Sequence, residues 1–163
     1  MRRNQKGFSL IELLIVVAII LIIAAITIPN LLRSRMAANE SSAVGSIRTI
    51  NTAEVTYSTT YPAVGFANLA ALGGTAATCA TAGGATSAGA CLIDDVLAST
   101  GIKSGYTFTA TAGAGTPAVT YSSLGVPQVV GQSGQRGFCS DQSGVIRYNA
   151  AGTGCSVTTD PAL

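Results

Sequence analysis

The sequence predicts an α+β protein: one long N-terminal helix with an apolar half that projects and an amphipathic half that packs on a small antiparallel sheet. Three patterns predict this architecture. A nearly pure aliphatic run comes first, a helical stripe of apolar residues follows it, and apolar residues alternating with threonine come later. With 163 residues, the chain is long enough for one modest globular domain and an accessory segment. We expect four parts: a polar leader (1–7), an apolar helix (8–29), the amphipathic half of that helix (30–58) and a C-terminal globular domain (59–163).

The aliphatic run has the length of a membrane span. From Leu13 to Ile28, twelve of sixteen residues are Leu, Ile or Val. As a helix, residues 8–28 extend about 31 Å, which matches the roughly 30 Å hydrocarbon core of a bilayer. The rest of the chain is too small to enclose such a helix, so we expect a membrane-inserted state.

Basic residues flank the run on both sides. Arg2, Arg3 and Lys6 precede it, and Arg33 and Arg35 follow it. By the positive-inside rule the leader charges predict a cytoplasmic N-terminus, although the two later arginines weaken the bias. The overall charge of +2 depends on the leader, since without its three basic residues six basic groups face seven acidic ones. Such a chain lacks the phosphate-neutralising charge that nucleic-acid binding requires.

The second half of the helix carries one apolar stripe. Its members recur at spacings of three and four residues: Ala43, Ile47, Ile50, Ala53 and Tyr57. We expect the charged residues to lie largely off this stripe: Arg33, Arg35, Glu40, Arg48 and Glu54. The stripe requires a partner surface, for which the C-terminal domain is the candidate. Two positions weaken the helix locally, Pro29 and Gly45, and the Tyr61-Pro62 step ends it.

The C-terminal domain begins with loops and ends with strands. We expect one helical turn near residues 66–72, a Gly/Ala/Thr-rich surface loop over 73–90 and a short helix over 92–97. Alternation predicts strands at 106–111 and 118–123, and the turn DQSG predicts a hairpin between 137–140 and 145–149. Three or four antiparallel strands would suffice to cover the helix stripe.

The four cysteines indicate disulfides rather than a metal. None belongs to a CxxC pair and the chain has no histidine, so a zinc site has little support. An even number in the domain expected outside the cell membrane suggests an oxidising compartment. Four cysteines allow three pairings, of which sequence proximity favours Cys79–Cys91 and Cys139–Cys155.

Glu12 is the residue that a plain membrane anchor does not explain. A carboxylate deep in a bilayer costs about 3 kcal/mol, which the aliphatic residues outweigh, so the segment still inserts. A conventional secretory signal is shorter and does not usually carry an acid. The dipole of the first helical turn favours an acid by about 0.3–1 kcal/mol, and an ionisable group in a membrane is by default a functional residue. Cleavage between Gly7 and Phe8 would create an α-amino cation four residues before Glu12.

The segment GFSLIELLIVVAIILIIAAITIPN (7–30) resembles the N-terminus of type IV prepilins and of the related type II secretion pseudopilins. The matching features are Gly7, Phe8, Glu12 and Pro29 in fixed order, after a basic leader. Beyond the helix and the Tyr61-Pro62 step, the chain does not match the family closely.

The resemblance implies a pilin-like fold and a role for each matching position. A membrane aspartyl prepilin peptidase would remove the leader by cutting after Gly7 and would N-methylate Phe8. Glu12 would pair with the Phe8 amine of a neighbouring subunit in a helical filament, or with the Phe8 amine of its own chain. Pro29 would mark where the helix loosens in the filament. Inner-membrane assembly machinery would take the precursor from the membrane into a pilus or periplasmic pseudopilus, and no cofactor is implied.

Several functions remain as alternatives. A structural type IV pilin, for adhesion, motility or DNA uptake, is favoured over a type II secretion pseudopilin and a minor tip pilin. In support, the second cysteine pair brackets the C-terminal hairpin as a pilin's disulfide-bounded loop does, and the acidic calcium-binding loop of major pseudopilins is absent from the sequence. An enzyme is disfavoured because no histidine is present for a Ser-His-Asp or Cys-His arrangement. Calcium at Asp94-Asp95 has few other acids to complete six to eight oxygen ligands.

Overall fold

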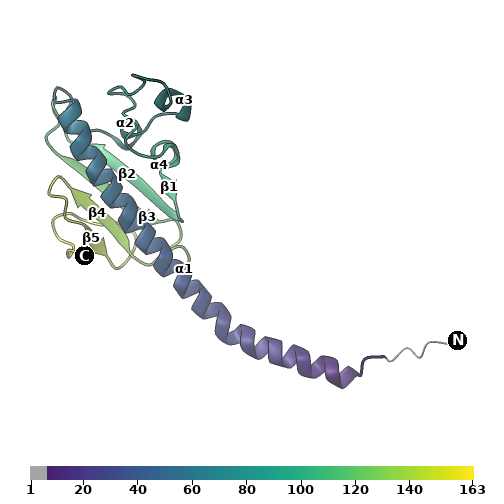
Figure 1. Ribbon diagram of the computed structural model, residues 1–163. Coiled ribbons are helices and arrows are strands. Elements are labelled where there is room, and N and C mark those ends of the chain that lie inside the picture. The colour runs from purple at the N-terminus through teal and green to yellow at the C-terminus, as the bar shows by residue number, and fades with distance from the viewer. Residues whose placement is uncertain (1–6) are drawn as a thin grey trace. The chain divides into compact units, whose positions relative to one another are not determined.

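The computed structural model describes residues 7–163 (Figure 1). The leader charges Arg2, Arg3 and Lys6 therefore lie outside the described residues. The chain divides into two compact units, one ending at Arg35 and one spanning Met36–Leu163. The helices are α1 (Leu10–Thr60), α2 (Leu69–Leu72), α3 (Ala76–Cys79) and α4 (Asp95–Thr100). The strands are β1 (Ile102–Lys103), β2 (Tyr106–Ala112), β3 (Tyr121–Pro127), β4 (Gly137–Asp141) and β5 (Arg147–Asn149).

Helix α1 belongs to both units and confirms the long N-terminal helix. It begins two residues later and ends two residues later than the predicted 8–58, and Tyr61-Pro62 follows it directly. Proline cannot continue a helix, and it restricts the residue before it, so the end of α1 is encoded locally. Pro29 lies inside α1, within the first unit.

The second unit contains one antiparallel sheet in the order β1-β2-β3-β4-β5, so each strand pairs with its neighbour in sequence. The longest ladder pairs β2 with β3, from Tyr106 opposite Pro127 to Ala112 opposite Tyr121. The α+β prediction is confirmed, with five strands where three or four were expected. The additional strand is β1, whose two residues are too short to produce a periodic signal.

The second predicted strand was placed too early in the chain. Residues 118–120 lie before β3, and β3 continues through Gly125 to Pro127. A glycine inside a strand indicates a close approach rather than a strand end. A Cβ at Gly125 would lie 2.8 Å from Cε1 of Phe108. The missing side chain therefore leaves room for the Phe108 ring.

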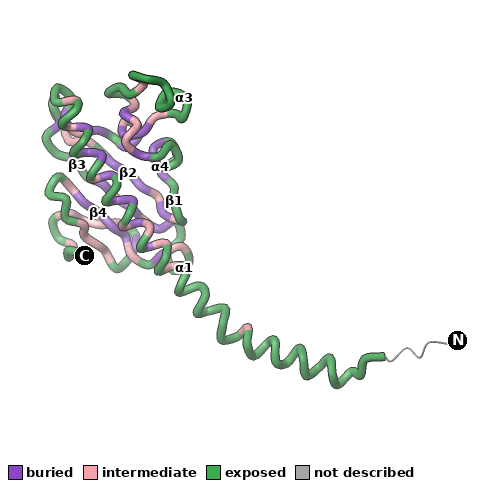
Figure 2. Tube along the Cα trace, in the orientation of Figure 1, coloured by how far each residue is buried: buried purple, intermediate pink, exposed green. Residues whose placement is uncertain are grey.

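The stripe on α1 is buried as predicted. Its five members have exposed fractions of 4% or less: Ala43, Ile47, Ile50, Ala53 and Tyr57. In the second unit this face of α1 packs with aromatic residues of the sheet, namely Tyr106, Phe108 and Phe138. Figure 2 shows the buried side of α1 over the strands. Two charged residues expected off the stripe are in fact buried, Glu40 and Glu54.

The short helices follow local capping signals. α2 confirms the predicted turn, and α3 lies inside the segment expected to be a loop. α4 starts at Asp95 rather than at Leu92, because Asp94 is its N-cap and accepts the Leu97 N–H at 2.9 Å. Gly101 ends it in the left-handed conformation (φ 65°) that glycine adopts without strain.

Two disulfides are present, Cys79–Cys91 and Cys139–Cys155, the pairing that sequence proximity favours. The first joins α3 to the segment before α4. The second joins β4 to the C-terminal tail, which also pairs with β5 through Arg147 and Ala162. The tail thus shields the outer edge of the sheet, where unpaired backbone groups would otherwise invite another strand.

Candidate processing and assembly site

The Gly7–Phe8 bond lies in backbone without regular structure. Residues 7–9 precede α1, which begins at Leu10. A Cβ added to Gly7 would meet no atom within 4 Å. Within residues 7–163, packing therefore does not require glycine at this position. A requirement for glycine would have to come from a molecule that binds this segment.

Glu12 lies in the first turn of α1 and bonds to the backbone just before it. The Ser9 N–H donates to Oε2 of Glu12 at 2.8 Å, and the Ser9 carbonyl accepts the Glu12 and Leu13 N–H groups at 3.1 and 3.3 Å. This is the glutamate half of a capping box, in which the third helical residue bonds to the N-cap amide. The Ser9-x-x-Glu12 spacing in the sequence is a signal for this hydrogen bond, but only the favourable interaction of Glu12 with the helix dipole was considered from the sequence. In the uncut chain Glu12 thus already has a partner, although the partner is neutral.

The first unit exposes a continuous aliphatic surface. Every Leu, Ile and Val between Leu10 and Leu32 has an exposed fraction of at least 44%, and Phe8 reaches 85%. Figure 2 shows the N-terminal half of α1 almost entirely in the colour of exposed residues. Within the described chain, α1 is a helix long and apolar enough to cross a membrane, by length and composition. So large an apolar surface is unfavourable in water, since isolated domains rarely expose apolar patches above a few hundred Å². Lipid or other apolar helices are the environments that suit it.

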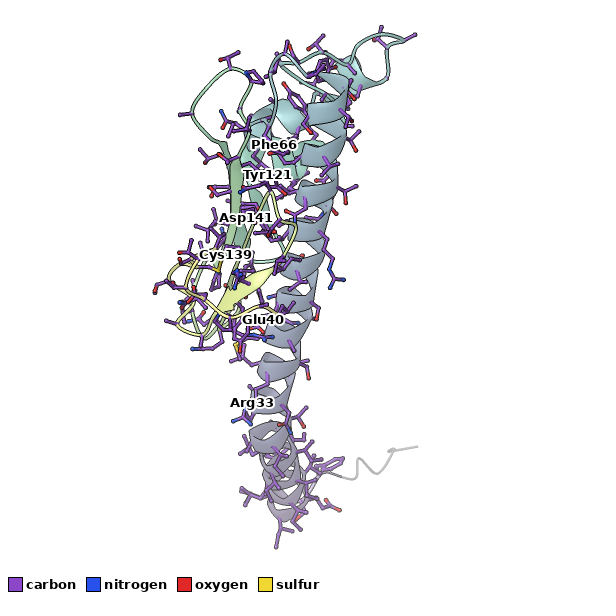
Figure 3. All side chains as sticks on the ribbon, turned by 90° about the vertical axis from the view of Figure 1, so that its left-hand side faces the viewer. Arg33, Glu40, Phe66, Tyr121, Cys139 and Asp141 are labelled. Atoms are coloured by element: carbon purple, nitrogen blue, oxygen red, sulfur yellow. A yellow bond between two sulfur atoms is a disulfide. The ribbon has the colours of Figure 1, made fainter. Side chains whose placement is uncertain are left out.

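Polar residues follow this surface at its C-terminal end. Arg33, which Figure 3 labels, is exposed, and so is Arg35. Further N-terminal, the Thr27 hydroxyl donates to the Ile23 carbonyl at 2.8 Å, which satisfies a polar group inside the aliphatic run. The first unit thus contains the predicted site residues Gly7, Phe8, Glu12 and Pro29, and its Leu, Ile and Val side chains from Leu10 to Leu32 are exposed.

In the second unit, Glu40 joins α1 to the segment before β4. Its Oε1 accepts the N–H groups of Gln135 and Arg136 at 2.9 and 3.2 Å, and its Oε2 pairs with the Arg136 guanidinium at 2.8–2.9 Å. The guanidinium also lies 5.5 Å from the ring centres of Phe138 and Tyr148. Burial raises the pKa of Glu40, but the hydrogen bonds from Gln135 and Arg136 outweigh it, so the pKa lies below its usual value.

Glu54, also on α1, has the opposite environment. Its exposed fraction is 0%. Its Oε2 accepts the Ala67 N–H at 2.9 Å, and its Oε1 has no hydrogen-bond partner. Burial raises the pKa of Glu54 to about 7, against the opposing effect of the Ala67 bond. Neither glutamate was predicted as a site residue, because a charged residue among apolar ones carries no pattern that tells buried from exposed.

Of the two carboxylates considered for calcium, Asp94 has another role. Asp94 caps α4 and pairs with Lys103 Nζ at 2.8 Å, and this hydrogen bond holds the pKa of Asp94 below its usual value. Within residues 7–163, no group of three or more His, Cys, Asp or Glu side chains is arranged to hold a metal ion.

Residues 2–28 match the family model described as the prokaryotic N-terminal methylation motif. The type IV wide pilus major component PilA4 of Thermus thermophilus is 67% identical over 39 residues, which are 24% of this chain and 30% of the relative. The type IV major pilin protein PilA of Myxococcus xanthus is 43% identical over 54 residues, 33% of this chain and 24% of the relative.

A third relative belongs to a secretion system. The type II secretion system core protein G of Dickeya chrysanthemi is 36% identical over 47 residues, 29% of this chain and 31% of the relative. The chain thus spans less than a third of the length of each of these relatives. No solved structure matches the chain significantly. In its N-terminal segment, therefore, the chain carries the prokaryotic N-terminal methylation motif and is similar to type IV pilins and to a type II secretion pseudopilin.

Proposed function

We propose that this chain is the structural subunit of a type IV pilus. A prepilin peptidase would cut after Gly7 and N-methylate Phe8, and the subunit would then assemble into a surface filament for adhesion, motility or DNA uptake. The observation that carries the proposal is Glu12, an acid placed at the start of an exposed aliphatic helix within the methylation motif. The role is structural rather than enzymatic.

Before assembly, the aliphatic surface would keep the precursor in the inner membrane with its N-terminus in the cytoplasm. During this stage the Ser9 N–H would donate a hydrogen bond to one of the two oxygens of the Glu12 carboxylate. Since glycine at position 7 has no packing role among the residues that the structure describes, its place before the cut fits recognition by the peptidase.

After the cut, the Phe8 amine is a cation that did not exist in the precursor. In a bundle of aliphatic helices, an unpaired carboxylate or ammonium costs several kcal/mol, whereas a paired one is tolerated. Axial registers that separate Glu12 from the Phe8 amine of a neighbour are therefore penalised. The pair would specify the filament register, and the aliphatic contacts would supply most of the free energy of association. Inner-membrane assembly machinery would extract the subunits.

The test compares two substitutions of Glu12. Glu12→Ala removes both the charge and the bond to Ser9, while Glu12→Gln removes the charge and keeps an oxygen that can accept the Ser9 N–H. If the charge pair directs assembly, both variants are cleaved but give at least tenfold fewer sheared filaments than wild type, counted by electron microscopy. Filaments from Glu12→Gln at the wild-type level would assign Glu12 to helix capping alone.

A second test addresses the cleavage site. Gly7→Leu adds a side chain whose Cβ meets no atom of the described part of the chain within 4 Å, so the fold of residues 8–163 should be unchanged. We expect uncut precursor by mass spectrometry, with the leader attached. Mature protein that begins at Phe8 in this variant would contradict the assignment.

A pseudopilin of a type II secretion system is the second candidate, because one relative belongs to that class. The pilin is favoured by two pilin relatives of higher identity and by the disulfide that closes the chain around β5. Microscopy of sheared cell surfaces separates the two functions. Long fibres whose subunit starts at methylated Phe8 support the pilus, and secretion defects without such fibres support the pseudopilus.

A further inference from the structure

Glu54 is a buried acid that filament assembly does not explain. It lies on α1 with an exposed fraction of 0%, and its Oε1 has no hydrogen-bond partner. Its only hydrogen bond in the described structure comes from the Ala67 N–H to Oε2, at 2.9 Å. A carboxyl group in such a site is far less costly protonated than ionised, because a buried charge without a cation loses its hydration.

The Ala67 bond attaches the segment that connects α1 to α2, residues 61–68. This segment turns at its start, where the Val64 and Gly65 N–H groups donate to the Tyr61 carbonyl. Its middle is held against the chain before β3, since Phe66 N–H donates to the Ala118 carbonyl at 3.0 Å and the Phe66 ring lies 4.8 Å from that of Tyr121 (Figure 3). Glu54 supplies a separate attachment, directly to α1.

The groups that face Glu54 offer no positive charge. Two titratable side chains interact electrostatically with Glu54, namely Tyr57 on α1 and Tyr121 on β3. Burial raises the pKa of both, that of Tyr121 to about 12, so both are neutral phenols at physiological pH. Further out, Tyr61 lies beside Tyr57, and Asp141 of β4 faces Tyr121. The ion pairs within residues 7–163 join Lys103 to Asp94 and Arg136 to Glu40.

We propose that Glu54 is a proton-operated latch for residues 61–68: the protonated carboxyl fastens the segment to α1, and loss of the proton weakens this attachment. In the neutral acid, Oε2 is the carbonyl oxygen that accepts the Ala67 N–H, and Oε1 carries the proton. Opening of this attachment would let water reach the carboxylate and would loosen the backbone around Ala67, while Val64 and Phe66 keep their hydrogen bonds with Ala118. The latch is a property of the folded subunit and does not depend on its assembly into a filament.

The direction of the pH effect follows from linkage. The pKa of Glu54 is about 7 in the closed state, and the ordinary value of 4.5 applies once the carboxyl is hydrated. Between these values the closed state binds more protons than the open one, so the closed:open ratio falls about tenfold per pH unit. The total decrease is roughly 300-fold, and the ratio becomes constant above pH 7.

Hydrogen exchange of the Ala67 amide measures this ratio. We would record exchange by NMR on the full chain in detergent micelles from pH 5 to 8.5, corrected for the intrinsic base catalysis of exchange. The protection factor in wild type should fall about tenfold per pH unit up to pH 7 and then become constant. In Glu54→Gln, which keeps an acceptor for Ala67 without a titrating proton, it should not vary with pH.

Glu40→Gln is the matched control, because Glu40 is a second buried glutamate on α1 but contacts Arg136 and not residues 61–68. This variant should keep the wild-type pH dependence at Ala67. Protection of Ala67 that is constant with pH in wild type, or that falls equally in Glu54→Gln, would overturn the latch. If Glu54→Gln does not fold, the ¹³C shift of the Glu54 carboxyl in wild type decides: a midpoint near 7 supports the proposal, and one below 5.5 contradicts it.

Discussion

At Gly125 the absence of a side chain is a packing requirement. A Cβ there would lie 2.8 and 3.0 Å from two carbons of the buried Phe108 ring. Gly125→Ala should therefore displace this ring or bend β3, and overpacking of this kind costs about 1–3 kcal/mol of the free energy of unfolding. Urea denaturation of the full chain in detergent micelles, followed by tyrosine circular dichroism, measures the loss.

Gly45 provides the matched control. It lies on an exposed part of α1, and a Cβ there would meet nothing within 4 Å. Gly45→Ala should raise the stability of the monomer by about 0.5–1 kcal/mol, since alanine loses less backbone entropy in a helix. Equal destabilisation by both substitutions would contradict the assignment of a packing role to Gly125.

Single residues also show where prediction from sequence reached its limit. The motif positions Gly7, Phe8 and Glu12 could be named because their order and spacing are local properties of the chain. Glu40 and Glu54 could not be named in this way, because each depends on a hydrogen-bond donor that the local sequence does not indicate. The donor to Glu40 is Arg136, which is distant in sequence, and the donor to Glu54 is Ala67, which lies in an irregular segment. Periodicity reports which face of a helix is apolar, but it does not report where an acid finds a hydrogen-bond donor.

At the scale of elements, α1 could be predicted from local sequence signals, whereas the bounds of β3 depend on contacts with distant residues. The stripe on α1 repeats over four turns, so the apolar members of its buried face were predicted residue by residue. The bounds of β3 were predicted wrongly, because its register depends on the pairing with β2 and on the space that Gly125 leaves for Phe108. The helix predicted over 92–97 lay three residues before the observed α4. The reason is local, because Asp94 caps α4 and this signal was present in the sequence.

The ion pair between Glu40 and Arg136 is an element-level contact, since it joins α1 to the segment that leads into β4. Arg136→Met keeps most of the side-chain volume against Phe138 and Tyr148 but leaves the buried Glu40 carboxylate with only its two backbone donors. Loss of charge-assisted hydrogen bonds should cost about 2 kcal/mol of the free energy of unfolding at pH 7.

Two variants make this test specific. Arg136→Lys keeps the charge but not the two-pronged geometry, so it should lie between wild type and Arg136→Met. In the double variant Glu40→Gln/Arg136→Met, the loss should be smaller than the sum of the two single losses, because no buried charge remains without a partner. Additive losses would show that the pair does not couple the two elements.

For the whole molecule, the two buried glutamates predict a stability maximum in mildly acidic solution. The pKa of Glu54 is raised by burial from 4.5 to about 7, so its contribution is complete below pH 4.5 and is lost as the pH rises to 7. This shift corresponds to roughly 3 kcal/mol of the free energy of unfolding. The pKa of Glu40 is lowered by its hydrogen bonds despite burial, so its contribution is present above its ordinary value and is lost as the pH falls below it.

The two effects together place the maximum near pH 4.5–5, where Glu54 is still protonated and Glu40 is already ionised. Asp94, whose pKa is lowered by Lys103, adds to the loss on the acid side. Denaturation of the full chain in micelles from pH 3 to 8.5 should trace this profile. Glu54→Gln should remove the decline between pH 5 and 7 and leave the acid side unchanged, while Glu40→Gln should reduce only the acid-side decline. Stability that stays constant between pH 5 and 7 would show that Glu54 is ionised in the folded subunit, because a glutamate whose pKa is not raised contributes almost no slope above its ordinary value of 4.5.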